Sequence, residues 1–163
     1  ANLDLRGRQP LRVIFDARGQ LPPRSRVVND EHDTLLLTST AGAAHLQSHG
    51  VRCQSHLELE LLPVDAHGRL DPAVALRRLA ERQCNEVLVE SGARLAGSFL
   101  AAGLADELVV YLAPTVLGET GRPSFELPQP LRALEQRARF VYRDVRTVGV
   151  DLRLTLRPAE DNG

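Results

Sequence analysis

Short apolar runs alternate with helical segments through the middle of this chain, and this alternation constrains the fold more than any other feature. The runs within 11–19 and at 34–38 have the length of buried strands. Residues 55–63 alternate leucine with glutamate at first, which is typical of a strand with one wet face. Strands separated by helices need right-handed crossovers, so the sequence predicts an α/β fold with a largely parallel sheet.

Helix boundaries are indicated by local signals in two places. Asp71 is a candidate N-cap and Pro72 suits the first helical position, followed by leucines and alanines at helical spacing. Residues 93–102 are predicted to be helical, with Gly103 as the stop. The apolar run 86–90 that precedes this helix is predicted to be another buried strand.

The C-terminal third of the sequence has strand patterns and few helical signals. Residues 106–114 form a predicted strand that ends at a proline. Two longer strands are expected at about 138–147 and 149–157, joined by a tight turn near Gly149, and they give the sheet an antiparallel edge. Residues 118–130 are rich in glycine and proline and are predicted to be a long irregular loop.

Composition excludes several classes of function. A length of 163 residues and a net charge of -1 indicate one domain without the basic surface that nucleic acid requires. All 20 basic residues are arginine, so Schiff-base, Ser-Lys and P-loop lysines are excluded. The two cysteines form no CxxC pair, and no run resembles a signal peptide or membrane span. We therefore expect a soluble, cytoplasmic protein.

The stretch "EVLVESGARLAGSFL" at 86–100 has the composition of a binding turn. A helix start favours anions, and Gly92 and Gly97 leave room for a ligand near it. The stretch is neither a P-loop, because Ser98 stands where the lysine belongs, nor a dinucleotide fingerprint, because Arg94 replaces the second glycine. Spacing alone leaves two interpretations open, an anion site and a plain crossover turn.

Other polar residues give weaker signals. Glu90 closes an apolar run, where an α/β sheet places ligands, and it is either a ligand contact or a solvated acid. His45 and His49 lie one helical turn apart, but Leu46 stands where HExxH needs glutamate and no third ligand is evident. We interpret them as a surface pair and predict no metal site.

Residues 87–118, "VLVESGARLAGSFLAAGLADELVVYLAPTVLG", resemble the reductase domain of the bacterial bifunctional riboflavin-biosynthesis deaminase/reductase. In that family a strand ending in V-E-x-G precedes a helix with L-A-G, a G-L-x-D-E-L strand and a proline-ended segment. The matching residues here are Val89, Glu90, Gly92, Leu95 to Gly97, Gly103, Leu104, Asp106 to Leu108, Ala113 and Pro114. Residues 9–27 also look like the family's P-x-R-V-V-x-D-S-x-x-x-x-P segment.

The resemblance implies a dihydrofolate-reductase-like fold, an α/β three-layer sandwich whose mostly parallel sheet has an antiparallel C-terminal strand pair. It implies an NADPH-dependent reductase that converts 5-amino-6-(5-phosphoribosylamino)uracil, a phosphorylated pyrimidine, to the ribitylamino compound. In the family, hydride passes from the nicotinamide to C1′ of the opened ribose. A homodimer and a deaminase domain, fused or separate, are further expectations from the family.

The resemblance also implies which residues form the site. Cofactor contacts are expected at Ala17 and along Gly92, Ala93, Arg94, Leu95, Ala96, Gly97 and Ser98. Substrate contacts are expected at Leu3, Arg6 and Glu90, with Arg6 as a phosphate clamp. Ala17 stands where the family has serine, so a hydroxyl contact to the cofactor is lost while a backbone contact can persist. No side chain is assigned as a decisive acid or base.

The family's reductase domain begins further upstream, with K-x-A-x-S-x-D-G, S-x-W-I and D-A-x-x-x-G segments that this chain does not contain. We therefore expect residues 1–163 to be a single reductase-like domain without its N-terminal strands, and not competent alone. Two other interpretations stay open. One is an NADPH reductase of another pterin- or pyrimidine-like substrate, and the other is a non-catalytic module kept for dimerisation or regulation.

Overall fold

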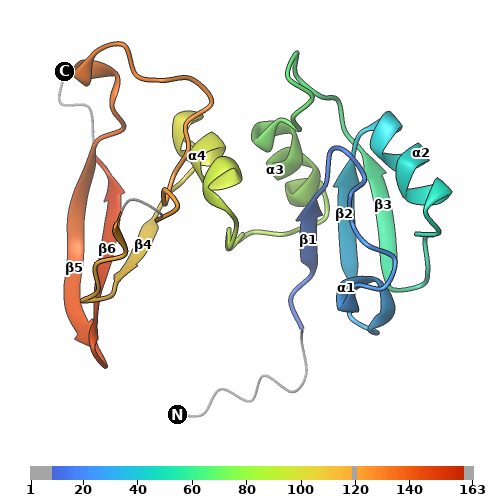
Figure 1. Cartoon of the computed structure of the whole chain (residues 1–163), viewed down its shortest axis with the longest axis horizontal. Helices are drawn as coiled ribbons and strands as arrows, with labels where there is room; N and C mark the ends of the chain where they lie inside the picture. Colours follow the sequence, from blue (N-terminus) through green and yellow to red (C-terminus); the bar gives the residue numbers. More distant parts are fainter. Residues whose placement is uncertain (1–8, 119–120, 160–163) are drawn as a thin grey trace. The chain divides into compact units, whose positions relative to one another are not determined.

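The computed structural model describes residues 9–118 and 121–159 of the chain (Figure 1). The chain divides into two compact units, Ala1–Asn85 and Glu86–Gly163. Leu3 and Arg6, two of the predicted substrate contacts, lie outside the described residues. The interpretation of residues 1–163 as one domain stays a prediction.

The first unit alternates strands with helices, as the hydrophobic pattern predicts. Its elements are β1 (Arg12–Phe15), α1 (Arg26–Asn29), β2 (Thr34–Thr38), α2 (Thr40–Ser48), β3 (Leu57–Leu61) and α3 (Pro72–Glu81). The three strands pair in the order β1-β2-β3, and both pairs are parallel. The prediction of a parallel sheet is therefore confirmed for this unit.

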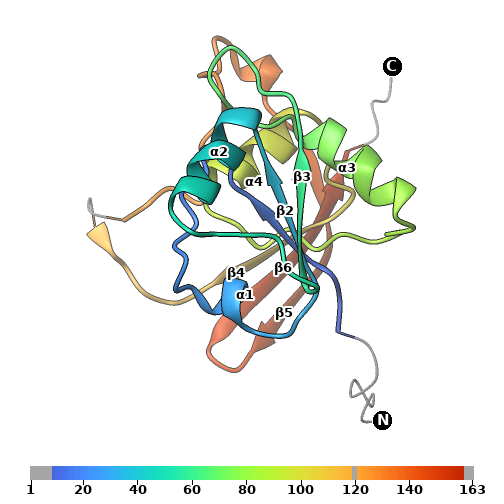
Figure 2. The same cartoon turned by 90° about the vertical axis from the view of Figure 1, so that its right-hand side faces the viewer.

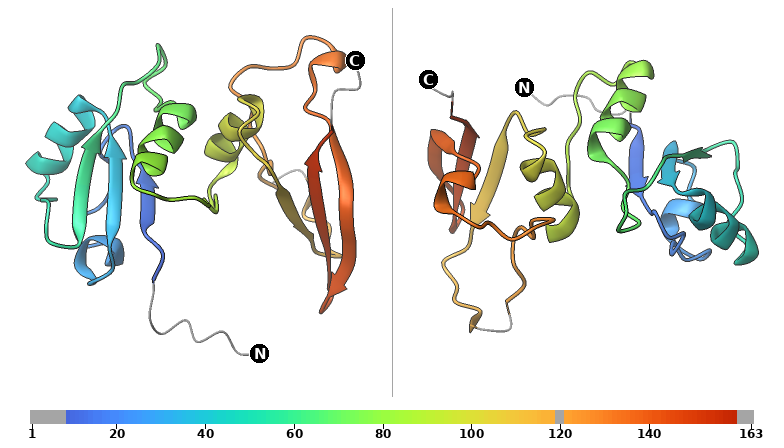
Figure 3. Two further views of the ribbon diagram at one scale, coloured as in Figure 1. Left: turned by 180° about the vertical axis from the view of Figure 1, so that it is seen from behind. Right: turned by 90° about the horizontal axis from the view of Figure 1, so that it is seen from above.

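Strand β2 lies at the centre of this sheet and is covered on both faces. Leu35 and Leu37 pack into a core with Ala75 and Leu79 of α3, whereas Leu36 packs into a second core with Leu46 of α2. The three β2 leucines have no exposed surface. Helices α2 and α3 accordingly lie on opposite faces of the sheet, as Figure 1 and the reverse view in Figure 3 show.

Two helices of this unit begin at side-chain caps. Asp71 accepts a hydrogen bond from the backbone N–H of Ala73 at 2.8 Å, and Pro72 occupies the first helical position of α3, as predicted. Helix α2 starts in the same way, because the Ser39 hydroxyl accepts from the Gly42 N–H at 2.9 Å. Figure 2 views the sheet with α2 toward the reader, and α1 lies at the end where β2 begins.

The polar face of β3 is less exposed to solvent than its alternating pattern indicates. Glu58 and Glu60 point toward the α3 side of the sheet, where Arg82 at the end of α3 donates to both carboxylates. Arg78 of α3 forms a further ion pair with Glu60 at 3.3 Å. The hydrogen bond from Arg82 lowers the pKa of Glu58. These carboxylates therefore join the last turns of α3 to the sheet.

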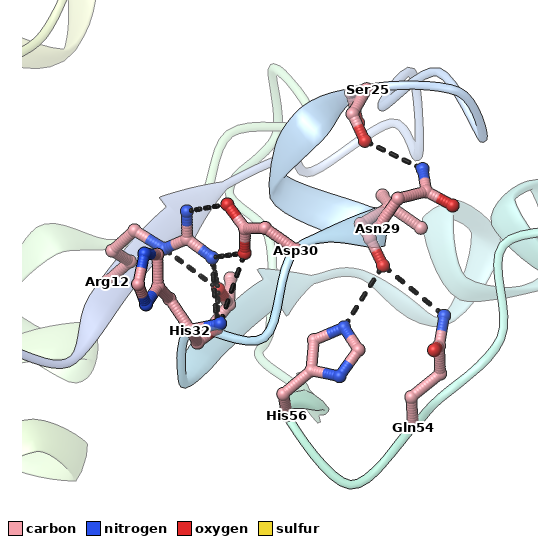
Figure 4. Close-up of polar contacts among 9 residues, drawn as sticks. Arg12, Ser25, Asn29, Asp30, His32, Gln54 and His56 are labelled. Atoms are coloured by element: carbon pink, nitrogen blue, oxygen red, sulfur yellow. Dashed lines mark hydrogen bonds and ion pairs between the residues drawn. The ribbon is translucent and has the colours of Figure 1, made fainter.

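A second charged contact lies at the start of β1, the other edge strand of the sheet (Figure 4). The guanidinium of Arg12 on β1 donates to the carboxylate of Asp30, at 2.7 Å to Oδ2, and to the hydroxyl of Thr34. The same guanidinium donates to the His32 carbonyl at 2.9 Å. The turn between α1 and β2 is thus held to the start of β1. The hydrogen bond from Arg12 lowers the pKa of Asp30 to about 2.

The second unit contains one α-helix, one 3₁₀ helix and three strands among its described residues. They are α4 (Ala93–Ala101), β4 (Leu108–Leu112), the 3₁₀ helix η2 (Leu134–Gln136), β5 (Phe140–Val148) and β6 (Asp151–Pro158). The helix predicted over 93–102 is confirmed, and Gly103 follows it with φ +64°. No helix within 9–118 or 121–159 is long and apolar enough to cross a membrane.

The sheet of this unit has the strand order β4-β6-β5, and both pairs are antiparallel. The predicted C-terminal pair is confirmed, and Gly149 in the turn between its strands has φ +63°. Strand β4 joins the same sheet, so the antiparallel part contains three strands where the sequence indicated two. The reason is that β6 has two edges, and β4 pairs with the one that β5 leaves open.

The low pKa of Asp30 predicts a pH-dependent contribution to stability. A carboxylate whose pKa is lowered by folding stabilises the fold above its unfolded pKa of about 3.9, and this stabilisation is lost as pH falls toward 2. The stability difference between the wild type and Asp30→Asn should therefore shrink between about pH 4 and pH 2. Urea unfolding at several pH values measures this difference in the free energy of unfolding. The neighbouring exposed acid variant Glu31→Gln is the control, and a difference independent of pH would contradict the assignment.

Candidate functional site

The segment that follows β1 carries the first predicted cofactor contact, Ala17. Asp16 folds this segment back on itself, because its carboxylate accepts the backbone N–H groups of Gln20 at 2.9 Å and Leu21 at 2.7 Å. Gly19 adopts φ +69° in the turn and donates its N–H to the Asp16 carbonyl. Asp16, placed at the carboxyl end of β1, is therefore occupied in shaping the turn.

Ala17 is half-buried, and its carbonyl already has a partner. The Ser39 hydroxyl donates to it at 2.7 Å, and the Thr38 hydroxyl donates to the neighbouring Asp16 carbonyl at 2.6 Å. The backbone donor that Ala17 can offer to a ligand is its N–H. Ala17 lacks the hydroxyl of the family's serine, so this N–H is the donor that remains for a ligand.

The strand predicted at 86–90 is wrong for this structure. Residues 85–91 pair with no strand among the described residues, and Leu88 is 82% exposed. The apolar pattern of residues 86–90 is compatible with a buried strand. A strand also needs a neighbouring strand whose backbone groups pair with its own hydrogen-bonding groups. Glu90 is therefore an exposed acid two residues before a helix cap.

Helix α4 begins at Gly92 with open space around it. A side chain added at Gly92 would meet nothing within 4 Å, and the residue has an ordinary extended conformation with φ −71°. The N–H groups of the first helical turn have no acceptor within the helix and carry the positive end of its dipole. This turn, Ala93 to Leu95, has the geometry that receives an anion.

Gly97 lies on the same helix but has a different environment. A Cβ at this position would come within 2.1 Å of the carbonyl oxygen of Glu126. The Glu126 N–H donates to the Ala93 carbonyl at 2.9 Å, and the Glu126 carboxylate accepts from the exposed Arg94 at 3.1 Å. The room at Gly97 is filled by another part of the chain, so this glycine has a packing role whatever its relation to a cofactor.

The remaining residues of the predicted cofactor segment have ordinary helical surroundings. Leu95 and Ala96 are half-buried, and the Ser98 hydroxyl donates to the Arg94 carbonyl at 2.9 Å. Of the predicted contacts, the structure thus groups Glu90 with the start of α4 in the second unit. Ala17 belongs to the first unit.

The two histidines that sequence spacing singled out lie on α2 and at its end. The His45 and His49 rings are 4.1 Å apart, and His45 Nδ1 donates to the Gly19 carbonyl at 2.8 Å. His49 Nδ1 lies 2.9 Å from the His45 carbonyl. Within the described residues, no three or more His, Cys, Asp or Glu side chains form a group that could hold a metal ion.

Three side chains contact the Ala17 segment: Thr38, Ser39 and His45. Sequence reasoning missed Thr38 and Ser39, and it singled out His45 without indicating this contact. Ser39 had a detectable signal, since a serine after an apolar strand is a common N-cap. The contacts themselves join residues 22 to 26 positions apart in the chain. No local pattern indicates such a pairing.

The sequence pattern of one family, the RibD C-terminal domain, matches residues 1–154. The chain belongs to this family. It is 34% identical over 149 residues to the riboflavin biosynthesis protein RibD of Escherichia coli K12, covering 91% of the chain and 38% of that protein. It is 25% identical to the 5-amino-6-(5-phosphoribosylamino)uracil reductase of Buchnera aphidicola subsp. Acyrthosiphon pisum, covering 91% of the chain and 68% of that protein.

A comparison with solved structures agrees with the family assignment. The structure of Acinetobacter baumannii RibD, form 2, superposes with a TM-score of 0.75 at 32% identity, covering 97% of this chain and 40% of that one. The dihydrofolate-reductase-like α/β fold class implied by the sequence resemblance is thereby supported. The chain spans about two fifths of the length of these RibD proteins.

The two glycines of the α4 segment should respond differently to substitution. Gly97→Ala forces a Cβ against the Glu126 backbone, and overpacking of this kind costs about 1–3 kcal/mol of the free energy of unfolding. Gly92→Ser has open space and introduces a favourable N-cap residue, so its stability should stay within about 0.5 kcal/mol of the wild type. Urea unfolding compares the two. A Gly97→Ala variant as stable as Gly92→Ser would contradict the packing role.

Proposed function

We propose that this chain is the reductase part of a riboflavin-pathway enzyme that reduces 5-amino-6-(5-phosphoribosylamino)uracil to 5-amino-6-(5-phosphoribitylamino)uracil with NADPH. The observation that carries the proposal is the family match over residues 1–154. The Buchnera relative, of which the chain covers 68%, bears the name of this reductase. The open start of α4 supports a phosphate-bearing cofactor of this kind.

In this proposal the first turn of α4 binds a phosphate of NADPH. The backbone N–H groups that follow Gly92 supply the donors, and the absence of a side chain at Gly92 lets the phosphate approach them. The segment Ala93 to Ser98 continues the contact surface. When bound, NADPH supplies the hydride that reduces C1′ of the opened ribose.

The substrate is assigned to three residues at other positions. Glu90 is exposed immediately before α4, where its carboxylate can accept hydrogen bonds from hydroxyl or amino groups of the substrate. Leu3 and Arg6 are assigned to the substrate by resemblance, with Arg6 on its phosphate. The chain's contribution to rate is to hold hydride donor and acceptor together, and no side chain is assigned as acid or base.

Two family expectations complete the proposal, a homodimer and a deaminase domain that is fused or separate. The chain covers 38% of E. coli RibD, so the rest of that relative has room for a further domain. NADPH titration of the full-length gene product tests the central claim. Absence of NADPH binding would favour the alternative of a non-catalytic module that keeps the reductase fold.

A bulky side chain at Gly92 should remove NADPH binding. Gly92→Leu fills the open space in front of the first-turn N–H groups, so the phosphate cannot reach them. We expect at least a tenfold higher Kd for NADPH, measured by fluorescence titration of the full-length gene product. Ala101→Leu, which adds the same side chain at the exposed far end of α4, is the control and should bind normally. Equal affinities in the two variants would place the phosphate elsewhere.

Loss of the Glu90 carboxylate should weaken substrate binding and leave the cofactor unaffected. Hydrogen bonds to a charged group contribute about 1.5–3 kcal/mol, so Glu90→Gln should raise KM for the pyrimidine substrate about 10- to 100-fold. The Kd of NADPH should not change. Glu86→Gln, at the other end of the same run, is the matched control. A KM equal to that of the wild type would mean that Glu90 is a solvated acid.

A further inference from the structure

Three carbonyl groups in the turn after β1 each accept a hydrogen bond from a side chain of the β2–α2 region. The Thr38 hydroxyl donates to the Asp16 carbonyl at 2.6 Å, and the Ser39 hydroxyl donates to the Ala17 carbonyl at 2.7 Å. His45 Nδ1 donates to the Gly19 carbonyl at 2.8 Å. A carbonyl oxygen can only accept, so the Nδ1 atom of His45 carries a proton.

These three bonds orient the opposite side of the turn as well. In a trans peptide the C=O of one residue and the N–H of the next point in opposite directions, and the described chain has no cis peptide bonds. With the Asp16 and Ala17 carbonyls directed at their donors, the N–H groups of Ala17 and Arg18 are directed away from them. The turn therefore presents two adjacent backbone donors on the side away from α2.

The turn approaches α2 without any layer of side chains between them. A Cβ at Gly19 would lie 2.1 Å from the Gly42 carbonyl oxygen, and a Cβ at Gly42 would lie 2.5 Å from the Ala17 carbonyl oxygen. Gly19 also needs its positive φ of +69°. The position of the turn relative to α2 therefore depends on this close backbone contact and on the hydrogen bonds that its carbonyls accept from the β2–α2 region.

His45 is the member of this set whose hydrogen bond joins the residues furthest apart in the chain. It comes from the second turn of α2 and bonds a residue 26 positions away. Its ring lies against the tilted His49 ring, with the ring centroids 4.1 Å apart, and His49 Nδ1 is in turn hydrogen-bonded to the His45 carbonyl. The ring is thus held on α2 in the orientation that meets Gly19.

We propose that His45 is a positioning residue for cofactor binding: by holding the Gly19 carbonyl it fixes the turn in place, so that the N–H groups of Ala17 and Arg18, whose direction Thr38 and Ser39 set, stay aimed at NADPH. The inference rests on the proposed function and extends it to a side chain that does not touch the cofactor. It also explains how an alanine at position 17 can serve, since the turn binds through main-chain donors whose direction is set from α2.

Two substitutions separate this role from a general effect on folding. His45→Leu removes the donor at similar size, whereas the side-chain N–H of His45→Asn lies close to the position of Nδ1 and can replace it. His45→Leu should raise the Kd of NADPH about three- to tenfold, the range of one net hydrogen bond, and leave kcat at saturation unchanged. It should also speed amide exchange at Gln20 and Leu21. His45→Asn should restore both, and Gln47→Leu, at an exposed position of α2 away from this contact, should alter neither by more than about twofold.

The readouts distinguish the failure of this inference from the failure of the proposed function. All are made on the full-length gene product by NADPH titration and hydrogen exchange. If the wild type binds NADPH and His45→Leu matches it in both affinity and exchange, the role of His45 is overturned. The same holds if His45→Asn behaves as His45→Leu does. If the wild type binds no NADPH, the proposed function fails and the cofactor role of His45 fails with it.

Discussion

Burial of strand β2 on both faces is the constraint on which the first unit depends. Its three leucines are fully buried and alternate between the α3 and α2 cores, and burial of one such side chain contributes about 1.5–3 kcal/mol. Since β1 runs parallel to β2, their carboxyl ends meet at one edge of the sheet. The turn that contains Ala17 therefore lies beside Ser39 and the start of α2, which is the arrangement that its hydrogen bonds require.

The two proposed cofactor contacts, one in each unit, rely on backbone groups more than on side chains. The turn after β1 uses its carbonyls for internal contacts and leaves N–H groups for a ligand, and the first turn of α4 offers N–H groups by its helical geometry. Backbone donors tolerate changes of side chain. A cofactor contact proposed at Ala17 therefore does not depend on the serine hydroxyl that the family has there.

Features set by neighbouring residues were predictable from the sequence, and features set by distant partners were not. Asp71 with Pro72 and the glycine at 103 locate helix ends through contacts of a few residues, and both predictions are confirmed. The run 86–90 has a strand pattern but no ladder partner among the described residues. Gly97 illustrates a further difficulty, because a glycine kept for packing against Glu126 has the same sequence signature as one kept for a ligand.

The contact of Glu126 with α4 links the start of that helix to the irregular segment after residue 121. Glu126 is bonded to Ala93 and paired with Arg94, both within the first helical turn. Coupling free energy is reciprocal, so a ligand that orders this turn also stabilises the segment, and detachment of the segment loosens the turn. A ligand bound at the start of α4 would therefore slow proteolytic cleavage of residues 121–130.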